Sequence, residues 1–66
     1  MGNWEDEFRM VAAQRGYGLR QCHFDILSSK WEVLLDDGSE RGLEIIRGTT
    51  VAIKVAIRSL PERSVA

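Results

Sequence analysis

The chain contains very little of the material from which small domains build covalent or metal supports. It has one cysteine, Cys22, and one histidine, His23, so we expect neither a disulfide framework nor a zinc site. It also lacks an apolar run near the roughly 20 residues that span a bilayer. A chain of 66 residues buries only about 60% of the surface that it exposes when unfolded. We therefore expect one domain over 1–66 that holds no cofactor and gains support from a partner.

The chain also lacks an excess of charge of one sign. Nine Lys and Arg against ten Asp and Glu leave a net charge of −1, which gives the whole chain no attraction for a nucleic-acid backbone. One unpaired thiol and no recognisable signal peptide predict a reducing, cytoplasmic location without a membrane. Proline occurs once, at Pro61, and aliphatic residues are frequent, which argues against disorder. The composition predicts a compact domain with a frayed tail over 61–66.

The first expected element is a helix over about residues 4–15. Asn3 is a good N-cap, and the acidic residues 5–7 complement the positive end of the helix dipole. Apolar residues then recur at helical spacing along one face. They are Trp4, Phe8, Val11 and Ala12. The segment Gly16-Tyr17-Gly18 predicts a turn in which the aromatic ring packs back on the helix.

Two strands with one apolar face each are expected next. The segments 19–27 and 31–36 alternate apolar with polar residues, and Ser28-Ser29-Lys30 between them turns the chain. The apolar positions are Cys22, Phe24 and Ile26 in the first strand and Trp31, Val33 and Leu35 in the second. This pattern predicts an antiparallel hairpin. A second turn, around Gly38, ends the second strand.

The rest of the chain allows two interpretations. Residues 40–46 alternate as a third strand would, yet Ser39 could also cap a short helix that ends at Gly48. Residues 49–60 fit a strand when read at period two, and they fit a helix when read at a period of 3.6. A strand over 40–46 followed by a helix over 49–60 gives the order α-β-β-β-α. A helix over 39–47 followed by a strand over 50–58 gives α-β-β-α-β.

The signals at the two ends of the segment 49–60 favour a helix. Thr49 or Thr50 can act as an N-cap, and Pro61 follows the end of the pattern. Two alanines four residues apart add helix propensity. We therefore predict an α+β domain of order α-β-β-β-α, with a three-stranded antiparallel sheet and both helices on one face. The order α-β-β-α-β is the alternative.

Candidates for catalytic chemistry are few. Cys22 and His23 are neighbours, but adjacent side chains in a strand point to opposite faces, so the imidazole cannot take the thiol proton. We expect Cys22 to pack in the apolar face and His23 to be exposed. Asp36 and Asp37 fit a turn in which they hydrogen-bond the backbone, rather than a metal site. The sequence predicts no enzymatic activity and no small-molecule substrate.

The order α-β-β-β-α in a chain of this size resembles the double-stranded RNA-binding domain. In that family the last helix opens with a Lys-Lys-x-Ala-Lys run, of which only the alanine has a counterpart here, Ala52. The family's groove-binding loop corresponds to Ser28-Ser29-Lys30, which is too short for that reach, and the first helix opens here with three acids. The resemblance implies a similar order of elements without RNA binding by the family's mode.

A surface for a protein partner has better support. If both helices cover the apolar face of the sheet, the opposite face carries Leu34 and Ile46 among polar side chains. On the last helix, Val51 and Val55 lie on a flank that nothing else in so short a chain covers. We predict that the partner binds the sheet face, through Leu34 and Ile46, or the flank of the last helix, through Val51 and Val55.

These observations predict a non-enzymatic protein-interaction module, or homodimer, that acts by binding or occluding another macromolecule. In size, charge balance and lack of motifs, the chain resembles the small modulators and inhibitors that phages and other mobile elements encode, anti-CRISPR proteins among them. The alternative is a nucleic-acid-binding or transcription-accessory domain whose basic residues gather on one face. These residues would be Arg9, Arg15, Arg20, Arg47, Lys54 and Arg58.

Overall fold

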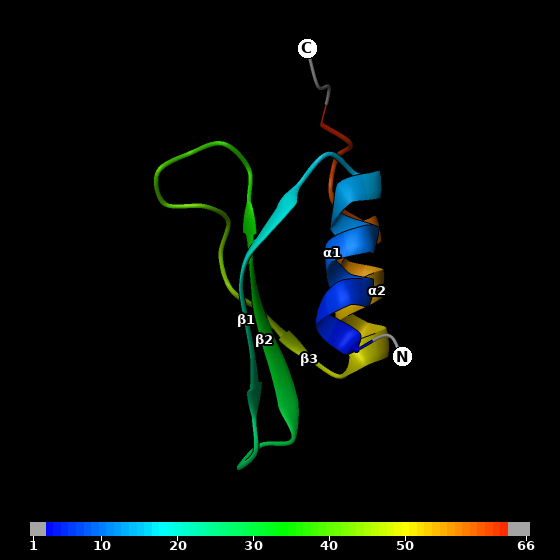
Figure 1. Cartoon of the computed structure of the whole chain (residues 1–66), viewed down its shortest axis with the longest axis vertical. Coiled ribbons are helices and arrows are strands. Elements are labelled where there is room, and N and C mark those ends of the chain that lie inside the picture. Colours follow the sequence, from blue (N-terminus) through cyan, green and yellow to red (C-terminus); the bar gives the residue numbers. More distant parts are fainter. Residues whose placement is uncertain (1–2, 64–66) are drawn as a thin grey trace.

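The computed structural model describes residues 3–63 and has the predicted order of elements. The elements are α1 (Trp4–Gln14), β1 (Gly18–Asp25), β2 (Lys30–Asp36), β3 (Ile46–Gly48) and α2 (Thr50–Arg58). The strands form one antiparallel sheet in the order β1-β2-β3. Both helices lie on the same face of this sheet (Figure 1). The α+β fold of order α-β-β-β-α is therefore confirmed, and the order α-β-β-α-β is wrong.

Side-chain caps begin both helices, as the sequence predicts. The Asn3 Oδ1 atom accepts a hydrogen bond from the Asp6 N–H at 2.8 Å, and the Thr49 Oγ1 atom accepts one from the Ala52 N–H at 3.2 Å. Each cap satisfies a backbone donor that the first turn of a helix leaves without a partner. The cap at Thr49 decides between the two periods of the segment 49–60, because it commits the following residues to helical geometry.

One apolar core lies between the helices and the covered face of the sheet. Its largest fully buried side chains are Phe8, Val33, Leu35, Ile53 and Ile57. Val11, Ala12 and Tyr17 complete the buried set. The core therefore joins one stripe of each helix to the central strand, which is the two-layer arrangement that a sheet with one apolar face requires.

A β-bulge at Arg20 changes the phase of β1. Leu19 pairs with Leu35, but Gln21 pairs with Leu34, so Arg20 is an extra residue in the ladder. Because of this extra residue, Leu19 shares the helix-covered face with Cys22 and lies against the core. A strand without the bulge could not place an odd-numbered and an even-numbered residue on one face.

The third strand is shorter and begins later than the predicted 40–46. A nine-residue loop, 37–45, separates β2 from β3. Gly42 in this loop has φ +74°, and a Cβ atom there would lie 3.0 Å from the Leu35 carbonyl oxygen. A strand cannot continue through a residue in the left-handed region, so no unbroken strand spans 40–46. Regular pairing with β2 starts at Ile46.

The late start of β3 reverses the predicted facing of Ile45 and Ile46. Ile46 pairs with Val33 and packs against the core, whereas Ile45 is 44% exposed. The prediction that Ile46 lies exposed on the open face is therefore wrong, because a shift of one residue moves every side chain of a strand to the other face. Leu34 does lie on the open face, opposite Gln21, but it is half-buried. The loop 37–45 runs close to the Leu34 side chain at Gly42.

The first strand ends two residues earlier than predicted. It stops at Asp25, and Ile26 belongs to the turn 26–29 with an exposed fraction of 80%. The expectation that Ile26 continues the apolar face is therefore wrong. Asp25 pairs with Lys30, which leaves the four residues between them outside the ladder.

Residues 60–63, which we call the strap, are hydrogen-bonded to the turn between α1 and β1. Arg15 Nη2 donates to the Leu60 carbonyl oxygen at 2.5 Å, and Tyr17 Oη donates to the Pro61 carbonyl oxygen at 2.6 Å. The Arg63 N–H donates to the Arg15 carbonyl oxygen at 2.8 Å. Of the tail expected to fray over 61–66, residues 61–63 thus bind the body of the domain, and 64–66 lie outside the described residues.

The strap is expected to contribute measurably to stability. Tyr17→Phe removes the hydroxyl that donates to Pro61 and should lower the free energy of unfolding by about 1 kcal/mol. For a domain of this size the melting temperature should fall by roughly 4–8 °C. Ser59→Ala, which removes an exposed hydroxyl bonded to the Val55 carbonyl, is the control and should change stability by less than about 0.5 kcal/mol. Equal melting temperatures for Tyr17→Phe and wild type would contradict this role of the strap.

Candidate interaction surfaces

The residues that could suggest catalysis are kept apart. Cys22 is half-buried on the helix-covered face, and its neighbour His23 is exposed on the open face, as the alternation of β1 requires. Burial, with a smaller contribution from the Glu5 carboxylate, raises the pKa of the Cys22 thiol. Within residues 3–63, no three His, Cys, Asp or Glu side chains form a group that could hold a metal ion. A raised thiol pKa suppresses the reactive thiolate.

Asp36 and Asp37 stabilise the start of the loop after β2. Asp36 Oδ1 accepts a hydrogen bond from the Gly38 N–H, and Asp37 Oδ1 accepts bonds from the N–H and the hydroxyl of Ser39, at 2.7–2.9 Å. The bonds from Ser39 lower the pKa of the Asp37 carboxyl. The predicted backbone-bonding role of this pair in a turn is confirmed.

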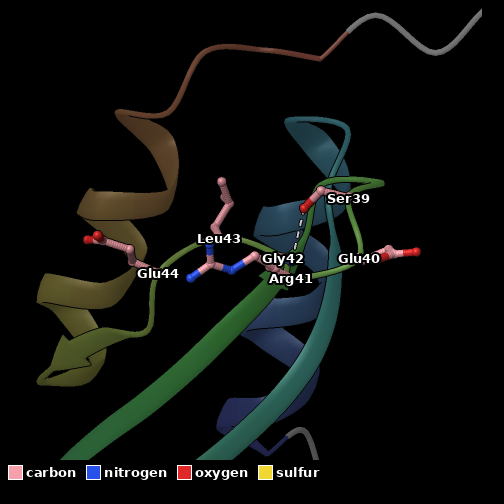
Figure 2. A pocket seen from close by; sticks show the side chains of 6 residues that line it. All are labelled: Ser39, Glu40, Arg41, Gly42, Leu43 and Glu44. Carbon is pink, nitrogen blue, oxygen red and sulfur yellow. Dashed lines mark hydrogen bonds between the residues drawn. The ribbon is translucent and has the colours of Figure 1, made fainter.

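The loop 37–45 forms a hollow of about 620 Å³ that is open to solvent. It is lined by Ser39, Glu40, Arg41, Gly42, Leu43 and Glu44. The Glu40 and Glu44 carboxylates point in opposite directions, away from each other (Figure 2). Arg20 donates to the carbonyl oxygens of Ser39 and Glu40 from the strand side, so its guanidinium holds the loop in place. No set of polar groups converges in this hollow, so we assign it no chemistry.

The six basic residues of the nucleic-acid alternative are spread over both layers of the fold. Arg47 lies on the open face of the sheet and pairs with Glu32 at 2.8 Å, whereas Lys54 lies in the helix layer and pairs with Glu7 at 3.5 Å. Arg9 and Arg20 also pair with carboxylates. Arg15 donates to the strap. The structure does not gather these side chains into the continuous basic face that phosphate binding needs.

The four predicted partner-binding residues lie on three different surfaces. Leu34 is half-buried on the open face of the sheet, and Ile46 packs on the opposite face against the core. Val51 and Val55 are exposed by 66% and 55%, one turn apart on α2. The structure therefore brings Val51 and Val55 together, but it does not join them to Leu34 or Ile46.

A larger apolar surface lies at the end of the β1–β2 hairpin. The hairpin extends past the N-terminal ends of both helices (Figure 1), so part of its helix-facing side has no helix above it. We use the name hairpin surface for the apolar residues at this end of the hairpin and at the adjoining start of α1. They are Phe24 and the half-buried Trp31 in the strands, Ile26 and Leu27 in the turn, and Trp4 in α1. Ile26 and Leu27 are 80% and 97% exposed, and Trp4 and Phe24 are each about 40% exposed. Single exposed aliphatic residues are common on proteins, whereas exposed apolar residues that lie next to one another form a patch.

Aromatic contacts connect the hairpin surface to the core. The buried ring of Phe8 lies 5.5 Å from the Trp31 ring in an edge-on arrangement, and Trp31 lies 5.0 Å from Phe24. On the other side, Phe8 stacks on Trp4 at 6.5 Å. The Lys54 ammonium lies 5.0 Å from the centre of the Trp4 ring, which it can bind through a cation–π interaction. These contacts fix the positions of the aromatic side chains.

The turn that carries Ile26 and Leu27 is held by Asp25. Its two carboxylate oxygens accept hydrogen bonds from the Leu27 N–H and the Ser28 hydroxyl, each at 3.0 Å. Ser29 completes the turn with φ +56°, a conformation that costs a non-glycine residue energy. The turn is therefore ordered by specific bonds, although its two apolar side chains contact solvent.

The sequence contains a signal for this surface that the strand pattern concealed. Ile26 and Leu27 are adjacent, and two adjacent apolar residues cannot both face the core from a strand. In the structure, Asp25 pairs with Lys30, and both apolar residues lie in the four-residue turn between them. Alternation alone extends β1 over Ile26 and hides the pair.

Comparison with protein-family models, with curated proteins and with solved structures found no match to this chain. Neither helix in the described part of the chain has the length and apolar content to cross a membrane.

The Asp25 bonds in the turn predict a measurable titration. The Ser28 hydroxyl, followed by the Leu27 N–H, lowers the pKa of the exposed Asp25 carboxyl below its ordinary value of 3.8. Ser28→Ala should move this pKa upward, toward 3.8, in a titration followed by carboxyl carbon NMR. The pKa of Asp37, which Ser39 lowers, should not change and serves as the internal control.

The sign of the pH effect follows from the direction of the shift. Because the folded pKa of Asp25 is lowered, its contribution to the turn is present above the unfolded pKa and is lost as the pH falls through the folded value. Identical Asp25 titrations in wild type and Ser28→Ala would show that the hydroxyl bond does not form in solution.

Proposed function

We propose that this protein is a non-enzymatic protein-interaction module that binds another macromolecule through the hairpin surface and acts by covering part of it. One observation carries the proposal: Ile26 and Leu27 are almost fully exposed at the tip of an ordered turn. Large apolar patches on small domains are typical of sites that contact proteins. Aromatic residues beside aliphatic ones are also enriched in the centres of protein interfaces.

The order of the turn supports binding. A loop that is fixed before binding loses less conformational entropy when it meets a partner, so more of the contact energy contributes to affinity. Asp25 supplies this order with two hydrogen bonds, and the paired strands below the turn hold its base. The left-handed Ser29 is a local strain that the fold tolerates beside the exposed apolar pair.

The other exposed surfaces are less suited to a protein partner. The open face of the sheet carries polar side chains such as Gln21 and His23, and its Glu32–Arg47 pair is exposed. Exposed ion pairs of this kind contribute little to binding or stability. On α2, Val51 and Val55 are the exposed large apolar side chains among the described residues. The hairpin surface is the largest of the three in apolar content.

The proposal predicts that an acidic residue at the tip weakens partner capture. Leu27 is 97% exposed, so Leu27→Asp should leave the fold and its stability within about 0.5 kcal/mol of wild type. Burial of the new carboxylate in an apolar contact is costly, and affinity should fall by at least about tenfold. Immobilised wild-type and variant chains, exposed to the same cell extract, would be compared by quantitative mass spectrometry.

Val51→Asp is the matched control, because it adds the same charge at an exposed position on α2. A macromolecule retained by wild type and by Val51→Asp, but lost from Leu27→Asp, supports the hairpin surface. Loss from Val51→Asp alone would move the site to the α2 pair. Retention by all three chains would overturn the proposal.

A further inference from the structure

The hairpin surface consists of two unlike parts that can fit each other. Its outer part is the aliphatic tip, Ile26 and Leu27, which projects beyond the helices (Figure 1). Its inner part is aromatic and lies nearer the helices, where Trp4 begins α1 and Phe24 contacts Trp31. An isologous contact uses the same surface of both copies, so that when residue i of one copy contacts residue j of the other, j also contacts i. Two antiparallel hairpins meet this condition when each tip lies on the aromatic part of the other.

The apolar area of the hairpin surface fits a small dimer interface. From their exposed fractions, the four exposed side chains present roughly 400 Å² of apolar surface. A standard interface buries about 800 Å² on each partner, of which somewhat more than half is apolar. The hairpin surface therefore supplies most of the apolar area that one side of such an interface requires.

The overall charge is also compatible with a second copy. The pair Asp25–Lys30 follows the pair Phe24–Trp31, so the alternation of the strands places these two charges on the open face of the sheet, away from the hairpin surface. The chain has a net charge of only −1, so two copies repel each other weakly.

We propose that a second copy of this chain covers the hairpin surface, in a two-fold dimer in which each Ile26–Leu27 tip packs on the aromatic part of the other hairpin. This inference rests on the proposed function, since it assigns a partner to the same surface. It also provides the support that a 66-residue chain without a disulfide gains by burying more apolar area.

The test uses the purified chain alone. Sedimentation velocity from low to high micromolar concentration should show a monomer that converts to a dimer. Leu27→Asp and, independently, Ile26→Ser should each weaken the dimer by at least about tenfold, while Val51→Asp should dimerise as wild type does. Amide NMR spectra of each variant would verify that the monomer fold is kept.

A second measurement locates the contact. In a dimer of one isotope-labelled and one unlabelled copy, filtered NOEs should join the Ile26 and Leu27 methyl groups of one copy to the indole protons of the other. A chain that stays monomeric at high concentration would overturn the dimer, and so would a dimer that survives Leu27→Asp or shows its NOEs elsewhere. A monomer whose capture of another protein still depends on Leu27 would overturn the dimer and leave the proposed function standing.

Discussion

The edge-on contact between Phe8 and Trp31 is the interaction on which both the core and the candidate surface depend. Phe8 is fully buried and joins α1 to the central strand, while Trp31 is only half-buried and continues toward Phe24. Aromatic packing thus passes without a break from the interior to the exposed hairpin. Because edge-on aromatic pairs have a preferred geometry, the core determines how the hairpin is oriented relative to the helices.

The domain is small, so contacts between distant segments must help to stabilise it, and the strap supplies some of these contacts. Disulfides and metal sites connect distant segments in many domains of this length. Here the carbonyl groups of residues 60 and 61 accept bonds from Arg15 and Tyr17, more than 40 positions away in sequence. The Arg63 guanidinium also lies 5.7 Å from the centre of the Tyr17 ring. Hydrogen bonds between segments far apart in sequence therefore take the place of a covalent link.

The sequence predicted those parts of the fold that depend on local signals. Caps at Asn3 and Thr49 and the alternation around Val33 each act over a few residues, and they lead to the correct elements and order. The start of β3 depends on Gly42 and its closeness to β2, which is a long-range contact. Because β3 starts later than predicted, the Ile46 side chain faces the core and not the open face, so it does not lie beside Leu34. The exposed tip was missed for a related reason, since the end of β1 follows from its register with β2.

The bulge at Arg20 has a consequence for the free edge of the sheet. β1 is an edge strand, and the unpaired backbone groups of such a strand can add a strand from another chain, which leads to open-ended aggregation. A bulge interrupts the even spacing of these groups and increases the local twist, so a straight incoming strand can match only the part beyond it. The Arg20 side chain also pairs with Asp36 and donates a hydrogen bond to the loop, so a charged side chain lies beside the bulge. The irregularity that aligns Leu19 with the core thus also discourages backbone-mediated polymerisation along this edge.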